Sequence, residues 1–257
     1  MISNRETREV VVVTGGNGLI GSNFLRALAG SGRVAVGCDL TVPNGDDLNP
    51  ESQSLGAIDH LVMDVSDPNS VESAIEVLHQ RYGRIDGLVN AAYPRNDNFG
   101  DTFFNVKYEN FCENVNLQLG GYFLTSQKFS KYFVDNTQGC VINLASIYGC
   151  VAPRFDLYDD TPMGMPVEYP LVKAGIIQLT QYLSVLLKGT GVRANCISPG
   201  GILDNQPPVF LDRYQSQCAS KGMLDPEDLN STLLYLLASE SKYINGQNII
   251  VDDGFVL

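Results

Sequence analysis

The stretch Val10-Val11-Val12-Val13-Thr14-Gly15-Gly16-Asn17-Gly18-Leu19-Ile20-Gly21 decides the fold. Its four consecutive valines are typical of a short strand that is buried on both faces of a sheet. Glycines follow at positions 16, 18 and 21, and apolar residues with helical spacing come next. A strand, a glycine turn and a helix in this order bring backbone N–H groups and a helix N-terminus to one point, where a pyrophosphate binds. The sequence therefore predicts a dinucleotide-binding βα unit.

The rest of the chain repeats this alternation. Further strands are predicted over 33–39, 60–63, 85–90, 140–144, 192–197 and 248–251, and further helices over about 68–78, 110–135, 168–188 and 226–238. Alternating strands and helices predict an α/β fold, a doubly wound parallel sheet of the Rossmann type. With no internal repeat or linker, residues 1–257 are expected to form a single domain.

Ligands of such sheets bind at the carboxyl ends of the strands. Asp39, Asn90, Ser146 and Pro199 all fall at predicted strand ends. Asp39 lies 18 residues beyond Gly21, where a carboxylate accepts hydrogen bonds from ribose hydroxyls and repels a 2′-phosphate. We therefore expect NAD, not NADP, as the cofactor. Arg33 begins the same strand and should point away from this end.

Tyr169 and Lys173 are four residues apart, so they share one face of a helix. A neighbouring ammonium lowers the pKa of a phenol, and such a phenol can take a proton from an alcohol or return it. Tyr148 and Tyr158 are rival phenols, but neither is followed by a lysine at this spacing. Together with the glycine turn, the pair predicts an oxidoreductase that acts on an alcohol/carbonyl pair.

From about Val10 to Leu257 the motifs resemble the short-chain dehydrogenase/reductase family. The resemblance implies that Tyr169 is the catalytic acid/base and that Lys173 lowers its pKa and binds the nicotinamide ribose. It implies that Ser146 hydrogen-bonds the reacting oxygen, and that Asn116 holds a water in a proton relay. The Thr-Gly-x-x-Gly-x-x-Gly spacing of residues 14–21 is similar to that of the extended members, but too little chain follows Pro199 for their extra domain, so the compact type is expected.

The same resemblance assigns cofactor contacts. They are Gly15, Asn17, Gly18, Leu19 and Ile20 in the glycine loop, Asp64 and Val65 at the adenine, Asn90, Ala91 and Ala92 after the fourth strand, and Pro199, Gly200 and Ile202 at the nicotinamide. Two positions depart from the family pattern. Tyr93 stands where the family has glycine, which predicts a bulkier wall beside the cofactor, and Asp204 stands where it has threonine.

The 23 residues from Ser146 to Tyr169 exceed the usual family spacing, and the excess lies at about 151–167. Long connections of this kind are usually functional or disordered, so we expect a substrate wall or lid. Arg95 and Arg154 are the candidate pair for an anionic group of the substrate, unless neighbouring aspartates bind them. The sequences of residues 92–96, 146–149 and 200–207 resemble those of a narrower branch of the family, the bacterial dehydrogenases of nonulosonic-acid and flagellin-glycan synthesis. This resemblance implies an amino-sugar or sugar-phosphate substrate.

Composition narrows the partners. The formal net charge of −12 disfavours nucleic acid and anionic membranes. The six cysteines form no C-x-x-C pair and only two histidines are present, which predicts a reducing cytoplasmic location and no metal site. The first nine residues are too polar for a signal peptide, and no apolar run has membrane-spanning length. The resemblance implies a homotetramer or homodimer paired through the helices 110–135 and 168–188, with Phe129, Tyr132, Phe133, Leu183 and Leu187 as candidate apolar surface.

Two other functions fit these motifs. One is an epimerase or dehydratase of nucleotide sugars that recycles its NAD, which net NADH production would distinguish. The other is a regulatory NAD-binding protein without turnover, against which the intact Ser146, Tyr169 and Lys173 argue.

Overall fold

The computed structural model describes residues 8–43 and 56–257, so most of the polar N-terminal segment lies outside it. Its centre is a seven-stranded parallel sheet in the order β3-β2-β1-β4-β5-β6-β7. The strands are β1 (Val10–Thr14), β2 (Val34–Asp39), β3 (Ala57–Val62), β4 (Gly87–Asn90), β5 (Gly139–Leu144), β6 (Val192–Pro199) and β7 (Asn248–Val251). The strand order reverses between β1 and β4, which places a ligand-binding crevice at their carboxyl ends. The doubly wound Rossmann-type fold is confirmed.

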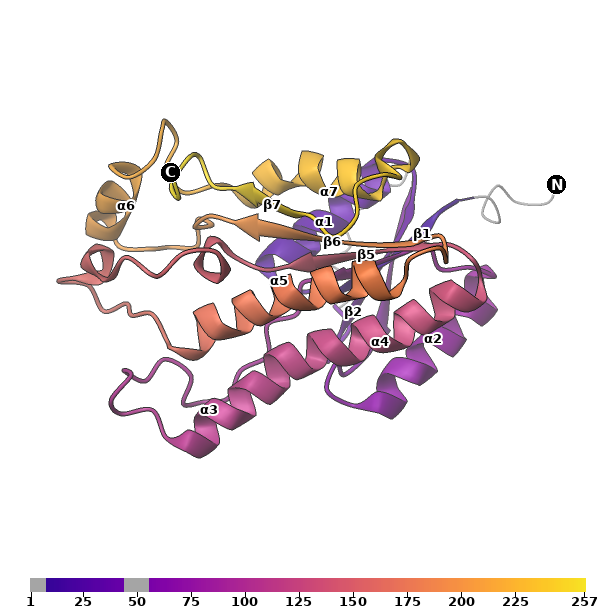
Figure 1. The fold of residues 1–257 in the computed structure, drawn as a ribbon, viewed down its shortest axis with the longest axis horizontal. Coiled ribbons are helices and arrows are strands. Elements are labelled where there is room, and N and C mark those ends of the chain that lie inside the picture. Colours follow the sequence, from indigo (N-terminus) through magenta and orange to yellow (C-terminus); the bar gives the residue numbers. More distant parts are fainter. Residues whose placement is uncertain (1–7, 44–55) are drawn as a thin grey trace.

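Helices cover both faces of the sheet (Figure 1). One layer contains α2 (Pro68–Tyr82), α4 (Gly121–Asp135) and α5 (Glu168–Leu186), and the other contains α1 (Leu19–Gly30) and α7 (Asn230–Leu237). At one end of the sheet, α3 (Tyr108–Val115) extends α4, and α6 (Pro208–Gln215) packs near the segment 155–158. Both helical layers therefore leave the carboxyl edge of the sheet available for a site.

The valine run of β1 shows why the sheet is buried on both sides. Val10 and Val12 pack into the apolar cluster beneath α2, α4 and α5, whereas Val11 and Val13 pack beneath α1 and α7. Each valine is at most 1% exposed. Alternate side chains of a strand point to opposite faces, so an unbroken apolar run packs into the apolar cores on both faces of the sheet.

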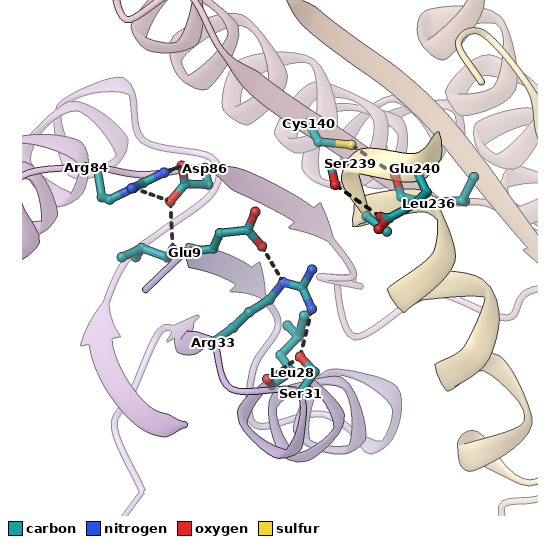
Figure 2. Close-up of polar contacts among 12 residues, drawn as sticks. Glu9, Leu28, Ser31, Arg33, Arg84, Asp86, Cys140, Leu236, Ser239 and Glu240 are labelled. Atoms are coloured by element: carbon teal, nitrogen blue, oxygen red, sulfur yellow. Dashed lines mark hydrogen bonds and ion pairs between the residues drawn. The ribbon is translucent and has the colours of Figure 1, made fainter. Parts of the chain in front are cut away.

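Polar side chains hold the amino edge of the sheet, away from the site (Figure 2). Asp86 accepts the backbone N–H of Val10 at 2.8 Å and pairs with Arg84. Arg33 donates to the Glu9 carboxylate at 2.8 Å and to Ser31. Because Arg33 is bound at this edge, it is absent from the ribose end of β2, as expected.

Most element boundaries agree with the sequence, and β7 agrees at both ends. Asp67 caps α2 by accepting the Asn69 N–H at 2.9 Å, and Pro68 is its first residue. Two features were not predicted. The helix expected over 110–135 is interrupted by a π-helical turn, Asn116–Gly120, and α6 is an additional helix.

The expected apolar surface is in a different place. Phe129 and Phe133 are fully buried, and Leu183 and Leu187 are nearly so, because they form the core beneath the sheet. The exposed apolar side chains of α4 and α5 are instead Phe123, Leu171, Tyr182, Val185 and Leu186. No helix in the described ranges is long and apolar enough to cross a membrane.

Candidate active site

A cavity of about 810 Å³ lies along the carboxyl ends of the strands. The glycine loop and β2 form one end, the segment after β4 and the ends of β5 and β6 form the middle, and the segment 158–165 with α6 closes the other end. The predicted site residues that line it are Gly15, Gly18, Leu19, Ile20, Asp39, Asp64, Val65, Ala91, Ala92, Arg95, Ser146, Tyr169, Lys173, Pro199, Gly200 and Ile202. Asn17, Asn90, Asn116 and Arg154 are not among the lining residues.

The glycine loop is shaped for close approach of a ligand to the backbone. Gly15 has a φ of +69°, and a Cβ there would lie 2.7 Å from Cα of Ala92. A Cβ on Gly21 would lie 2.0 Å from the Gly15 carbonyl oxygen, so only glycine lets α1 start against the loop. No side chain caps the first turn of α1 and no acidic residue lies in it. Its N–H groups and positive helix end therefore suit an anionic group such as a pyrophosphate.

Asp39 ends β2 and lines the cavity. One carboxylate oxygen accepts the backbone N–H of Asn17 at 3.0 Å, and the other accepts that of Leu40 at 2.8 Å. Asn17 itself is exposed, and its side chain donates to the Thr41 carbonyl. Asn17 thus shapes the loop around Asp39, whereas the carboxylate presents negative charge where a ribose would lie.

The end of β4 is held by buried hydrogen bonds. The Asn90 amide donates to Ser126 and Asn143, and its oxygen accepts from Thr125. The Thr14 hydroxyl accepts the N–H groups of Ala91 and Ala92. The Asn90 side chain ties β4 to β5 and α4 and does not line the cavity. Its neighbours Ala91 and Ala92 line the cavity.

Ser146, Tyr169 and Lys173 converge on the middle of the cavity. Ser146 follows β5 and accepts the Tyr148 N–H at 3.2 Å, at the start of a short 3₁₀ turn. Lys173 is 5% exposed, and its Nζ donates to the Leu144 carbonyl at 3.0 Å. The Tyr169 ring centre lies 5.6 Å from this Nζ. Three polar groups, one just after β5 and two on α5, therefore face one space.

Burial dominates the ionisation of this trio. It lowers the pKa of Lys173 to about 8, and no carboxylate among the described residues offsets the loss of water. It also raises the pKa of Tyr169, although a hydrogen bond with Ser146 acts in the opposite direction. Desolvation is the largest influence on the Tyr169 pKa, and Lys173 is not among the groups that shift it, so the expected effect of Lys173 on this phenol stays a prediction.

The structure does not place Asn116 at the site. Asn116 is exposed at the start of the π-helical turn, whereas Gln118 is buried, at 1% exposure. Neither amide atom of Gln118 has a hydrogen-bond partner in the described part of the chain. A π-helical turn contains more residues than an α-helical one and so changes which side chain faces inward. Gln118 borders a small recess with Thr14 and Asn90, behind the cavity.

The two arginines predicted to bind an anionic group do not lie together. Arg95 lines the cavity, with its guanidinium carbon 5.5 Å from the Tyr93 ring centre. Arg154 instead lies over the Phe255 ring at 4.4 Å and donates to Gln217 at 2.7 Å. The aspartates near it in sequence do not bind it. Arg154 fixes the 151–167 segment to the C-terminus, so the expected pair of arginines in the cavity is wrong.

Aromatic and methionine side chains form the far end of the cavity. They are Tyr93, Tyr148, Tyr158, Met163, Met165, Phe210, Tyr214 and Met223. The Tyr214 hydroxyl accepts the Gly201 N–H at 2.7 Å, which connects α6 to the loop after β6. Most of these residues come from the 151–167 segment and α6, and the sequence had no motif that could place α6 beside β6.

Comparisons with known proteins agree with this geometry. The family model described as enoyl-(acyl carrier protein) reductase matches residues 17–256. The chain belongs to the short-chain dehydrogenase/reductase family. It is therefore an oxidoreductase by family. The post-translational flagellin modification protein A of Campylobacter coli is 38% identical over 97% of this chain and 98% of its own length.

Two further relatives show the breadth of the family. The 3-oxoacyl-[acyl-carrier-protein] reductase of Thermotoga maritima is 28% identical over 97% of this chain and 98% of its own length. A short-chain dehydrogenase from Leptospira borgpetersenii, solved with bound NAD⁺, has a TM-score of 0.86 and 29% identity, and the match covers 100% of this chain and 97% of that one. Each of these matches spans nearly the whole length of both chains.

Proposed function

We propose that this short-chain dehydrogenase/reductase is an NAD-dependent enzyme that interconverts an alcohol and a carbonyl on a sugar derivative. The observation that carries the proposal is the convergence of Ser146, Tyr169 and Lys173 in the same cavity as the glycine loop. A proton acceptor, a donor to oxygen and a dinucleotide cradle in one space are what hydride transfer from an alcohol requires.

Each residue has a role in the proton chemistry. Tyr169 takes the proton of the substrate hydroxyl in oxidation and returns it in reduction. The Ser146 hydroxyl donates to the reacting oxygen as charge develops on it. Lys173, when protonated, stabilises the Tyr169 phenolate by the attraction between the two opposite charges.

The cofactor is NAD, which supplies the hydride acceptor when bound. Gly15 and Gly21 leave room for a pyrophosphate against the backbone, and Asp39, which lines the same end of the cavity, would hold the adenosine ribose. Asp64 and Val65 line the cavity beyond β3, beside the expected adenine position. The solved Leptospira relative with bound NAD⁺ supports this assignment.

The substrate end of the cavity supports a sugar derivative. Apolar side chains of Met163, Met165 and Phe210 suit the C–H face of a sugar ring, and several phenols suit its hydroxyls. Arg95 suits an anionic group such as a phosphate. The 38% identity to a flagellin modification protein is consistent with an amino sugar or sugar phosphate. The segment 151–167 forms the outer wall of this subsite.

One screen tests the proposal. The protein is incubated with NAD and, in turn, glucose 6-phosphate, glucosamine 6-phosphate, N-acetylglucosamine and UDP-N-acetylglucosamine, and NADH formation is followed by absorbance. Net NADH with at least one compound supports a dehydrogenase. Conversion of a nucleotide sugar without net NADH would indicate the NAD-recycling epimerase or dehydratase instead, and NAD binding without any conversion would indicate a regulatory protein.

A further inference from the structure

Tyr93 lies beside both Tyr169 and Lys173. Its ring is edge-on to the Tyr169 ring, with centres 5.8 Å apart and planes at 90°. On its other sides lie Phe99, at 5.7 Å, and the guanidinium of Arg95, at 5.5 Å. Tyr93 is 38% exposed and lines the cavity, so it is held by aromatic contacts while one part faces the ligand space.

The Lys173 amine is surrounded by aromatic rings instead of carboxylates. The ring centres of Tyr93, Tyr122 and Tyr169 each lie 5.6 Å from Nζ. In the described residues, the amine has no ion pair and donates its hydrogen bond to a backbone carbonyl. An ammonium within about 6 Å of a ring centre is attracted by the π electrons, and more strongly where water is excluded.

The titratable groups around Lys173 are uncharged at neutral pH. They are the phenols of Tyr93 on the segment after β4, Tyr122 on α4 and Tyr169 on α5, together with the thiol of Cys196 on β6. Burial raises the pKa of each, and that of Cys196 reaches about 12. Arg95 and the buried Glu168 act on Tyr93 and not directly on Lys173. The rings therefore supply the electrostatic stabilisation that carboxylates do not.

We infer that Tyr93 is a positioning residue: its ring orients the Tyr169 phenol and stabilises the protonated amine of Lys173. The inference extends the proposed function and rests on it for the roles of Tyr169 and Lys173. A glycine at this position would leave one side of the Tyr169 ring without a neighbour and remove one of the three rings around the amine. The aromatic ring, and not the Tyr93 hydroxyl, is the part that acts.

The test separates the effects of the Tyr93 aromatic ring, its hydroxyl and the size of its side chain. Tyr93→Leu keeps an apolar side chain but has no π face, and Tyr93→Met is a second variant of this kind in case the first folds poorly. Tyr93→Phe keeps the ring and removes the hydroxyl. Phe99→Leu is the matched control, because Phe99 packs on the far side of Tyr93 and does not line the cavity.

Kinetics are measured with NAD and whichever compound of the screen gives the fastest NADH formation. In Tyr93→Leu we expect kcat to fall about three- to thirtyfold, with KM and the NAD Kd changed by no more than about twofold. The alkaline limb of its pH profile should move to lower pH by about 0.5–1.5 units, because the amine loses its proton more easily. Tyr93→Phe should restore both properties, and Phe99→Leu should resemble the unmodified protein.

A second readout needs no substrate. The free energy of unfolding is measured by urea titration across pH 6 to 10 for the unmodified protein and each variant. Because Lys173 holds its proton less firmly in the folded state, its contribution to stability rises with pH above about 8, and this contribution is read from the difference between Tyr93→Leu and Tyr93→Phe, which both lack the Tyr93 phenol. In Tyr93→Leu this rise should begin at lower pH, whereas Tyr93→Phe should keep the original onset.

Each outcome decides one question. Absence of turnover by the unmodified protein with every compound would contradict the proposed function, and the unfolding curves would still decide whether the Tyr93 ring stabilises the amine. Turnover with unchanged kcat in Tyr93→Leu and Tyr93→Met would overturn the inference alone. Equal losses in Tyr93→Phe and Tyr93→Leu would overturn it as well, since the hydroxyl would then be the acting group.

Discussion

Replacing Lys173 by methionine should change how the stability of the unliganded protein depends on pH. Lys173 is 5% exposed and its pKa falls from 10.5 to about 8 on folding. Because the folded pKa is the lower one, the unfolded chain binds more protons between about pH 8 and pH 10.5. The contribution of Lys173 to stability is therefore complete above pH 10.5 and is lost as the pH falls to about 8.

The magnitude follows from the two pKa values. They differ by about 2.5, and one pH unit corresponds to about 1.4 kcal/mol, so the whole change is about 3–4 kcal/mol. Methionine has a similar length and no charge, so Lys173→Met should lack this dependence. The difference in unfolding free energy between the two proteins should shift by about 2–3 kcal/mol in favour of the lysine protein from pH 8 to pH 10.

In the assay, urea unfolding is monitored by circular dichroism at several pH values, without NAD. Buried phenols and thiols with raised pKa also affect stability at high pH, but they are present in both proteins and cancel in the difference. Lys188→Met is the control, because Lys188 is exposed beyond the end of α5. Parallel stability curves for the Lys173 variant and the unmodified protein would show that the amine is hydrated in the folded state and would refute the reasoning.

Four further predictions concern catalysis and assembly. Tyr169→Phe should lower kcat by about 10²–10⁴ with NAD affinity nearly unchanged, and more than half the original activity would refute the role of the phenol. NAD should bind at least about tenfold more tightly than NADP, and Asp39→Ser should narrow that gap in a fluorescence titration. Arg95→Ala should raise the KM of a phosphorylated sugar about ten- to a hundredfold while Arg154→Ala leaves it unchanged, so equal KM values in the two variants would contradict the anion subsite. Light scattering should give a dimer or tetramer, and Val185→Asp on the exposed face of α5 should shift it towards the monomer, whereas a monomeric unmodified protein would contradict the pairing.

The fold could be predicted because its signals are local. Four valines in a row satisfy two apolar cores, and Asp67 followed by Pro68 starts α2 through a side-chain cap. Strand ends also bring distant residues together by topology alone. Asp39 and Ser146 are far apart in sequence and line the same cavity because parallel strands share one carboxyl edge.

The pKa values and contacts of the site side chains were less predictable, because a sequence motif does not show how deeply a side chain is buried. Spacing placed Tyr169 and Lys173 on one face of α5, and the structure agrees. Spacing could not show that the amine has no carboxylate neighbour in the described part of the chain, or that desolvation is the largest influence on both pKa values. Likewise, the positions of Arg95 and Arg154 in cleft-facing segments gave no indication that Phe255 and Gln217 bind Arg154.

The residues whose positions or contacts could not be predicted from the sequence lie where this chain departs from regular helix geometry or from the family pattern. Asn116 was assigned on the assumption of a regular helix, but the π-helical turn Asn116–Gly120 brings Gln118 inward, and no motif in the sequence marks that turn. Tyr93 was visible as a departure, yet its contacts with the Tyr169 and Lys173 side chains depend on three segments meeting in space. A bulky residue in place of a family glycine therefore does more than narrow the cavity. It adds an aromatic ring beside the proton-transferring groups, and the catalytic behaviour peculiar to this chain should depend on that ring.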